Sequence, residues 1–317
     1  MSSNNETLDY FVLDVFSERR LAGNPLAVMF NPGTLTAEMM QAIARETNLS
    51  ETTFVERRPA EVERKEGVRV RIFTTDEELP FAGHPTLGTA SLLRTIAPEC
   101  VVDDAVTLAL NVGPVPVRFE PQPADAPAWP VRGEMTQRDP KFGEILDSSE
   151  VATLTGLSVE DFDPAHPVRI SSTGTAFAIV PLRSAEALAR LRVRQDEATA
   201  YLRAKGARWF YVLGPEATSI DAQFPQWRAR MQFNGGEDPA TGSAAGCAIS
   251  YLVFSGAVPP DQTIHVRQGV EMLRPSDLYL TATLSGDANS TAHERRVTNV
   301  RVGGSTILVA KGQLFLP

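Results

Sequence analysis

The sequence predicts an α+β protein with largely antiparallel sheet, built as two duplicated domains. The expected strands occur as hairpins and the expected helices occur singly, so the two do not alternate as βαβ units. A GxGxxG segment is also missing, which argues against a Rossmann fold. The length of 317 residues suits two domains, because a domain usually has roughly 100–200 residues.

The first half of the chain is expected to contain a hairpin, a helix, two strands, a second helix and further strands. The first helix begins after Thr36, whose hydroxyl can cap it, and Glu38 suits its positive first turn. Between Val68 and Ile72, apolar residues alternate with arginine, which indicates a strand with one buried face. The predicted elements are Leu8–Phe16, Asn24–Phe30, Thr36 to Thr47, Thr52–Glu56, Gly67–Thr75, His84 to Arg94, and strands between Ala105 and Phe119.

A proline-rich segment, Pro121–Pro130, separates the two halves. Its four prolines remove backbone donors and restrict φ, so neither a helix nor a central strand can persist there. We therefore expect an N-terminal domain over residues 1–120, a linker over 121–130 and a C-terminal domain over 131–317. The second domain is predicted to contain Phe177–Pro181, a helical insertion over Ala185–Ala204, Trp209–Leu213, Arg228–Phe233, a helix over Gly242–Val253, and strands to the end.

One pattern occurs once in each half and consists of a strand, a turn with proline, and a glycine that opens a helix. The copies, whose paired residues are each 159 positions apart, are Arg69-x-Arg71-x₆-Glu78-x-Pro80-x-x-Gly83 and Arg228-x-Arg230-x₆-Glu237-x-Pro239-x-x-Gly242. Chance similarity between two strand–turn–helix units is the alternative explanation. The shared offset favours duplicated domains related by a pseudo-two-fold axis.

Composition and charge argue against several classes of function. The net charge of −9 and the pI of about 5.1 would repel nucleic-acid phosphates and anionic lipid. No apolar run approaches the ~18 residues of a membrane span, and the first nine residues do not resemble a signal peptide. Two cysteines, and four histidines without metal-ligand spacing, indicate neither a disulfide framework nor a metal site. A cytoplasmic location is expected.

Two loops place a small residue at the start of a predicted helix, namely Gly83-His84-Pro85-Thr86 and Thr241-Gly242-Ser243-Ala244. Backbone N–H groups at a helix start lack partners within the helix, and the helix dipole is positive there, so such ends bind carboxylate or phosphate. Ordinary capping by Thr241 or Ser243 is the alternative for either loop alone. Two copies at one offset favour a single cleft that holds an anionic substrate from two sides.

Three polar residues in these regions are candidates for proton chemistry. Glu51 lies between a helix and a strand, where a carboxyl group buried in a cleft would suit proton transfer, although a solvated glutamate is the commoner outcome. Asp238 belongs to an Asp-Pro dipeptide that follows Gly-Gly, and both dipeptides are typical of turns; His84 could simply cap its helix. None of these three residues is by itself sufficient to indicate an active site.

Taken together, several segments resemble the PhzF-like phenazine-biosynthesis isomerases, which belong to the wider diaminopimelate-epimerase-like fold. The resemblance covers nearly the whole chain in order, and it is weakest over residues 121–144 and in the helical insertion after Ser184. The matching segments are Asn48–Val55, Phe73–Gly88 and Glu237–Ala244, with further matches at residues 14–16, 23–28, 268–269 and 274–276.

This resemblance implies two similar domains, each a barrel-like, mostly antiparallel sheet around a central helix, with the active site between them. It also implies that Glu51 is the acid/base, that Asp238 and His84 assist it, and that the protein is a homodimer. The substrate pocket would be lined by Ser50, Gly83, Thr241, Gly242 and Ser243.

The helix-opening positions separate this chain from the racemases of that fold, which use two cysteines on opposite faces of the substrate carbon. His84 and Ser243 occupy those positions here, and one carboxyl group that removes and returns a proton on one face suits isomerisation. We therefore expect an isomerase without cofactor or metal, which acts on a small, cyclic, carboxylate-bearing substrate with Glu51 as the proton shuttle. A lyase or hydratase, and a catalytically silent small-molecule-binding protein, are the alternatives.

Overall fold

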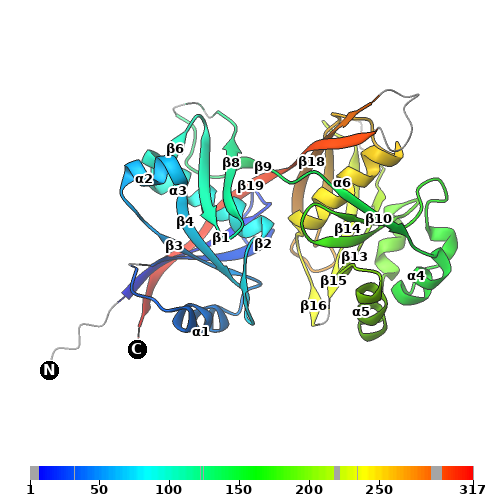
Figure 1. Ribbon diagram of the computed structural model, residues 1–317, viewed down its shortest axis with the longest axis horizontal. Coiled ribbons are helices and arrows are strands. Elements are labelled where there is room, and N and C mark those ends of the chain that lie inside the picture. Colours follow the sequence, from blue (N-terminus) through cyan, green and yellow to red (C-terminus); the bar gives the residue numbers. More distant parts are fainter. Residues whose placement is uncertain are drawn as a thin grey trace. The chain divides into compact units, whose positions relative to one another are not determined.

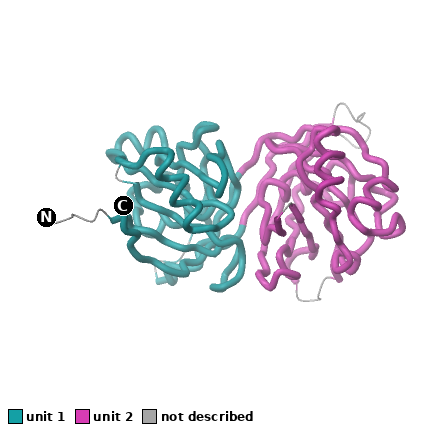
Figure 2. The backbone as a smooth tube through the Cα atoms, turned by 90° about the horizontal axis from the view of Figure 1, so that it is seen from below, with its two compact units in different colours: residues 1–135, 304–317 teal, residues 136–303 magenta. Residues whose placement is uncertain are grey.

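The computed structural model describes residues 7–31, 33–121, 123, 125–217, 222–233, 235–286 and 295–316 (Figure 1). The first six residues, two linker residues and His293 therefore lie outside the described residues. The chain forms two compact units, which are residues 1–135 with 304–317, and residues 136–303 (Figure 2). Strands and a few helices make up both units, so the predicted α+β class is confirmed.

Unit 1 is a barrel-like sheet around one buried helix. Its strand pairs follow the order β1, β2, β3, β4, β7, β8, β9, and the C-terminal strand β19 pairs with both β9 and β1. Helix α3 contacts β1, β2, β3, β7 and β8, and its residues are buried from Gly83 to Leu93. The elements are β1 (Thr7–Val15), β2 (Asn24–Asn31), α1 (Ala37–Thr47), β3 (Thr52–Glu56), α2 (Ala60–Glu66), β4 (Val68–Phe73), β5 (Glu78–Leu79), α3 (Gly83–Ile96), η1 (Pro98–Cys100), β6 (Val101–Val102), β7 (Ala105–Leu110), β8 (Gly113–Phe119), β9 (Val131–Thr136) and β19 (Arg296–Phe315).

Unit 2 surrounds helix α6 in the same manner. Helix α6 contacts β11, β12 and β18, and it is buried over most of its length. The elements are β10 (Lys141–Ile145), α4 (Ser148–Thr155), η2 (Val159–Asp161), β11 (Arg169–Ser172), β12 (Ala176–Pro181), η3 (Ala185–Arg190), α5 (Gln195–Ala204), β13 (Trp209–Pro215), β14 (Gln226–Arg230), β15 (Gln232–Phe233), β16 (Gly236–Glu237), α6 (Gly242–Ser255), β17 (Ile264–Gln268) and β18 (Ser276–Ser285).

The two units repeat one pattern of strand pairing. In unit 1 two of the six consecutive pairs are parallel, namely β2–β3 and β4–β7. The other four, in chain order β1–β2, β3–β4, β7–β8 and β8–β9, are antiparallel. In unit 2 the pairs β11–β12, β12–β13, β13–β14, β14–β17, β17–β18 and β18–β19 have the same types in the same order. This agreement supports the duplication that the recurring sequence pattern predicts.

Local sequence signals explain several elements. Thr36 caps α1 by accepting a hydrogen bond from the amide of Met39, and Asn48 ends the helix in the left-handed conformation with φ of 50°. Leu35 and Met40, which flank the cap, are both buried in one apolar cluster. Strand β4 buries its valines and Ile72 and leaves its arginines partly exposed, as the alternation predicts.

The structure divides the chain differently from the expected boundary at residues 121–130. Strand β9 lies after the proline-rich segment, but it pairs with β8 and so completes the sheet of unit 1. At the C-terminus, β19 leaves unit 2 and pairs with β1, from Thr7 opposite Phe315 to Val15 opposite Thr306. The expected second domain therefore contributes its first strand and the C-terminal part of its last strand to unit 1, because both satisfy hydrogen-bonding edges there, while the first part of β19 pairs with β18 in unit 2.

The helical insertion predicted over Ala185–Ala204 is two helices, η3 and α5, with residues 191–194 between them. It lies between β12 and β13, the place that α1 occupies between β2 and β3 in unit 1, so it is part of the repeat. The short helices α2 and α4 and the strands β10 and β11 were not anticipated from the sequence. No helix in the described ranges is long and apolar enough to cross a membrane.

Candidate active site

Glu51 lies in unit 1 at the junction between α1 and β3, as the sequence predicts. Two hydroxyl pairs hold this junction, because Thr47 Oγ1 lies 2.7 Å from Thr52 Oγ1 and Thr53 Oγ1 lies 2.9 Å from Thr89 Oγ1 in α3. The side chain of Glu51 is 17% exposed, so the carboxyl group is largely but not fully enclosed. Its backbone is thus fixed by elements on both sides, while its carboxyl group can reach a ligand.

His84 is the second residue of α3, and its ring faces Glu51. Nε2 of His84 lies 3.5 Å from Oε2 of Glu51. Nδ1 lies 3.3 Å from the side-chain nitrogen of Asn24, which is fully buried at the start of β2. The three side chains come from β2, from the α1–β3 junction and from α3, and they form one polar cluster inside unit 1.

Burial lowers the pKa of His84 to about 3, although a backbone hydrogen bond to Pro25 partly opposes that effect. The imidazole is therefore neutral near pH 7. Nε2 is buried and makes no hydrogen bond to the described residues. A buried polar nitrogen without a hydrogen bond is uncommon and marks a position where a ligand can bind.

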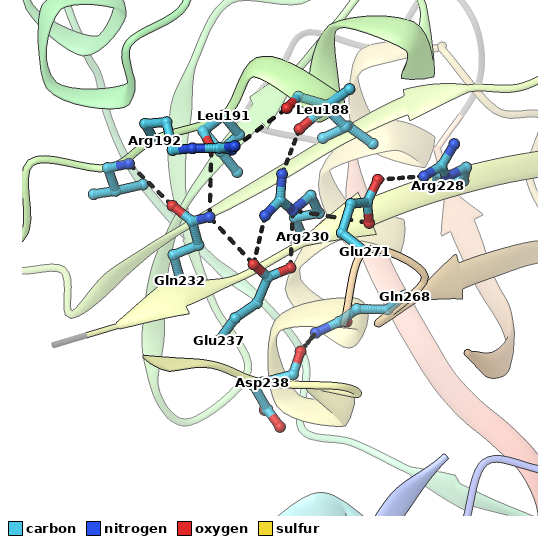
Figure 3. A network of polar contacts seen from close by, with 12 residues as sticks. Leu188, Leu191, Arg192, Arg228, Arg230, Gln232, Glu237, Asp238, Gln268 and Glu271 are labelled. Atoms are coloured by element: carbon cyan, nitrogen blue, oxygen red, sulfur yellow. Dashed lines mark hydrogen bonds and ion pairs between the residues drawn. The ribbon is translucent and has the colours of Figure 1, made fainter. Parts of the chain in front are cut away.

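Asp238 lies in unit 2, in the turn that leads from β16 to α6. On one side of it, Glu237 accepts two hydrogen bonds from Arg230, at 2.8 and 2.6 Å, and Arg230 also donates to the carbonyl of Leu188. The amide of Asp238 donates to the carbonyl of Met231 at 3.0 Å. Figure 3 shows the carboxyl group of Asp238 pointing away from the Arg230–Glu237 ion pair. The ion pair therefore anchors the turn, and the carboxyl group of Asp238 remains outside it.

The same ion pair occurs in unit 1. Arg71 donates to Glu78 at 2.8 and 2.6 Å, from Nε and Nη2, and Arg230 uses the same two atoms on Glu237. In both units the arginine lies on a strand and the glutamate precedes the helix start by five residues. The recurring residues of the sequence pattern thus form recurring ion pairs that hold each helix-opening turn.

Gly83 and Gly242 are the first residues of α3 and α6, as predicted. Neither residue before them supplies a side-chain cap, because Ala82 has no polar side chain and the hydroxyl oxygen of Thr241 accepts from Gln268 and not from an amide of the first turn. The expectation that Thr241 might only cap its helix is therefore not met. Each helix start keeps backbone N–H groups that an anion could bind.

The remaining predicted residues differ in exposure. Ser243 is partly exposed in the first turn of α6, and Ser50 is exposed beside Glu51. Cys247 is fully buried one turn inside α6 and Cys100 is buried near the end of α3, as structural thiols are expected to be. Within the described residues, no group of three or more His, Cys, Asp or Glu side chains could hold a metal ion.

Four polar residues that support the site were not identified as such from the sequence. Asn24 contacts His84, and Gln137 donates to the carbonyl of Gly242 at 2.8 Å. Gln268 and Tyr211 are connected to Thr241 and Asp238. Asn24 and Gln268 lie in segments that carry the family resemblance, and this resemblance could have identified them as part of the site. No feature of the sequence pointed to Gln137 or Tyr211.

Comparison with known proteins agrees with the fold. A family model described as phenazine biosynthesis-like protein, PhzC-PhzF, matches residues 13–312. An uncharacterized isomerase of Mesorhizobium japonicum is 35% identical, over 98% of this chain and 100% of the relative. The trans-2,3-dihydro-3-hydroxyanthranilate isomerase of Pseudomonas aeruginosa is 34% identical, over 97% and 99%. A solved structure of a predicted epimerase from Pseudomonas aeruginosa superposes with a TM-score of 0.76 at 33% identity and covers 98% of this chain and 100% of that one.

Proposed function

The chain belongs to the PhzC-PhzF family of phenazine biosynthesis-like proteins and is an isomerase, and we propose that it moves a proton within a small, cyclic, carboxylate-bearing substrate by acid/base catalysis. Glu51 removes a C–H proton that conjugation has activated and returns it elsewhere on the same face. The substrate class follows the named activity of the Pseudomonas aeruginosa relative. The proposal requires no cofactor.

One observation carries this proposal, namely the contact between the carboxyl group of Glu51 and a neutral, buried imidazole. Because the pKa of His84 is lowered to about 3, the ring brings no positive charge that would hold the Glu51 carboxylate in a permanent ion pair. A carboxyl group beside a neutral partner can take up and release a proton during one turnover. The second ring nitrogen contacts Asn24, so the ring keeps its orientation while the proton moves.

We assign substrate binding to residues at the two helix starts. The N–H groups at Gly83 in α3, and at Gly242 and Ser243 in α6, bind the carboxylate and the negative charge that develops during proton removal. Asp238 and His84 orient the amine or hydroxyl group of the substrate, and Ser50 and Thr241 line the pocket.

The two cysteines support isomerisation rather than racemisation. A racemase of this fold needs a thiol on each face of the substrate carbon, but neither cysteine lies at a helix start. Burial raises the pKa of Cys100 to about 11 and also raises the pKa of Cys247, so both are poor thiolates. The state of these thiols therefore supports the proposed one-sided carboxyl shuttle.

The test is turnover of trans-2,3-dihydro-3-hydroxyanthranilate in D₂O, followed by NMR. We expect isomerisation with solvent deuterium at the carbon that receives the proton. Glu51→Gln should lower turnover by about 10²–10⁴-fold while still binding the non-reacting aromatic analogue 3-hydroxyanthranilate by calorimetry. Glu38→Gln, an exposed carboxyl group in the first turn of α1, is the matched control and should leave turnover unchanged.

Other results point to the alternatives. Loss or addition of water would identify a lyase or hydratase, and binding without deuterium incorporation would identify a catalytically silent binding protein. Activity of Glu51→Gln within a few fold of the parent would remove Glu51 from the mechanism. We also propose that the protein is a cytoplasmic homodimer, and a monomer in sedimentation at micromolar concentration would contradict the dimer.

A further inference from the structure

We propose that Gln268 and Tyr211 are positioning residues that set the direction of a hydrogen-bond relay ending on Asp238. This inference rests on the proposed function, in which Asp238 contacts the substrate. Gln268 ends β17, and both its side chain and that of Tyr211 in β13 are fully buried. Neither residue is among those assigned to the pocket above.

Two backbone groups determine which way the amide of Gln268 faces. Its nitrogen Nε2 lies 2.8 Å from the carbonyl oxygen of Asp238, and its oxygen Oε1 lies 3.2 Å from the amide nitrogen of Thr241. A carbonyl can only accept and a backbone amide can only donate. The opposite orientation would face oxygen with oxygen and nitrogen with nitrogen, so the orientation of the amide is determined by the chain itself.

The orientation of the Gln268 amide in turn determines the direction in which the hydroxyl group of Thr241 donates. Nε2 also donates to Thr241 Oγ1 at 2.9 Å, which makes that oxygen an acceptor. The hydroxyl proton of Thr241 is then directed to Oδ2 of Asp238, 2.7 Å away. Tyr211 donates its hydroxyl proton to Oε1 of Gln268 at 3.1 Å. Both lone pairs and both protons of the Gln268 amide are thereby used.

The end of β17 approaches the turn closely enough to keep this relay in place. Gly269 follows Gln268 with φ of 74°, and a Cβ atom there would lie 2.4 Å from the carbonyl oxygen of Arg274 and 2.8 Å from that of Pro239. Only glycine permits this approach. Gln268 therefore acts from a rigid strand on a turn whose other side is held by the Arg230–Glu237 ion pair (Figure 3).

The first test removes single polar atoms and measures isomerisation together with thermal unfolding. Tyr211→Phe removes one donor to Gln268 and should lower kcat/KM by about 3–10-fold. Tyr251→Phe is the matched control, because Tyr251 is also buried in unit 2 and donates to a backbone carbonyl, that of Pro167, away from the relay. It should leave kcat/KM within twofold. Equal losses of kcat/KM in the two variants would show a merely structural role and overturn the inference.

The second test changes Gln268 itself. Gln268→Glu keeps the shape of the side chain but replaces Nε2 by an oxygen, so that Thr241 donates to the new carboxylate instead of Asp238. We expect kcat/KM to fall by about 10–100-fold. Because this effect acts through the hydroxyl group, adding Gln268→Glu to Thr241→Val should cause little further loss. Thr241→Ser should recover at least tenfold of the activity that Thr241→Val loses, and fully additive losses would overturn the inference.

A crystal structure of the Gln268→Glu variant tests the inference independently of the substrate. We expect Thr241 Oγ1 to leave Oδ2 of Asp238 and to contact the carboxylate that the substitution introduces. An unchanged contact with Asp238 would overturn the relay even if the isomerase activity is confirmed. If the parent protein does not isomerise the dihydrohydroxyanthranilate, the proposed substrate fails, and this structure still decides the relay. Should Gln268→Glu not fold, Tyr211→Phe and Thr241→Val keep the inference open to refutation.

Discussion

The paired arginines allow one substitution to be compared in two environments of the same protein. We expect Arg230→Met to lower the free energy of unfolding much more than Arg71→Met. The side chains of Arg230 and Glu237 are 6% and 11% exposed, whereas those of Arg71 and Glu78 are 20% and 25% exposed. Both pairs use the same two nitrogens at the same distances. The two substitutions therefore differ mainly in how deeply the ion pair that they remove is buried.

The magnitude follows from what each substitution leaves behind. Without Arg230, the Glu237 carboxylate keeps, among the described residues, one hydrogen bond, from Gln232 at 3.2 Å. The carbonyl of Leu188 loses one of its two donors and keeps the amide of Leu191. Removing one partner of a buried ion pair costs about 3–5 kcal/mol. Without Arg71, Glu78 is closer to solvent, which screens its charge, so the loss should be about 1–2 kcal/mol.

The measurement is guanidinium chloride unfolding followed by circular dichroism at pH 7, fitted for the unit that carries each substitution. The double variant Arg230→Met/Glu237→Leu is the internal control, because replacing both partners by apolar groups removes the uncompensated charge and should recover part of the loss. A loss for Arg71→Met equal to or larger than that for Arg230→Met would refute the reasoning, since burial would then not set the cost.

Three further predictions concern single sites. His84 should stay neutral down to about pH 3, observable by NMR of its ring nitrogens, and titration near pH 6.5 would contradict its burial. Because the unfolded chain binds this proton below about pH 6.5 and the folded chain does not, stability should fall from pH 6.5 towards 3, and less so in His84→Asn. Cys100 and Cys247 should not react with Ellman's reagent at pH 8 until the protein is unfolded, and fast labelling of the native protein would contradict their burial. Leu273 is 86% exposed at φ of 59°, so Leu273→Gly should relieve up to about 1 kcal/mol of backbone strain and maintain or raise the melting temperature; a clear decrease would show that the side chain makes a stabilising contact.

The repeat, most of the strands and helices that form it, and the helix starts at Gly83 and Gly242 could be predicted from the sequence. These features have local physical causes. The alternation in β4 defines a buried face, Thr36 caps α1, and a glycine opens both α3 and α6. The shared spacing of arginine, glutamate and glycine also corresponds to ion pairs of the same geometry in both units, because a turn of fixed length brings the arginine and glutamate side chains together.

How distant segments pair at sheet edges and direct their hydrogen bonds depends on the tertiary structure. The pairing of β19 with β1, across about 300 residues of chain, moved the expected domain boundary, since a strand carries no local mark of its partner. The neutral state of His84 depends on burial by the whole of unit 1. The direction of the hydrogen bond from Thr241 to Asp238 depends on Gln268, 27 positions along the chain from Thr241. Such properties arise from the environment that folding creates, and the residues themselves do not specify them.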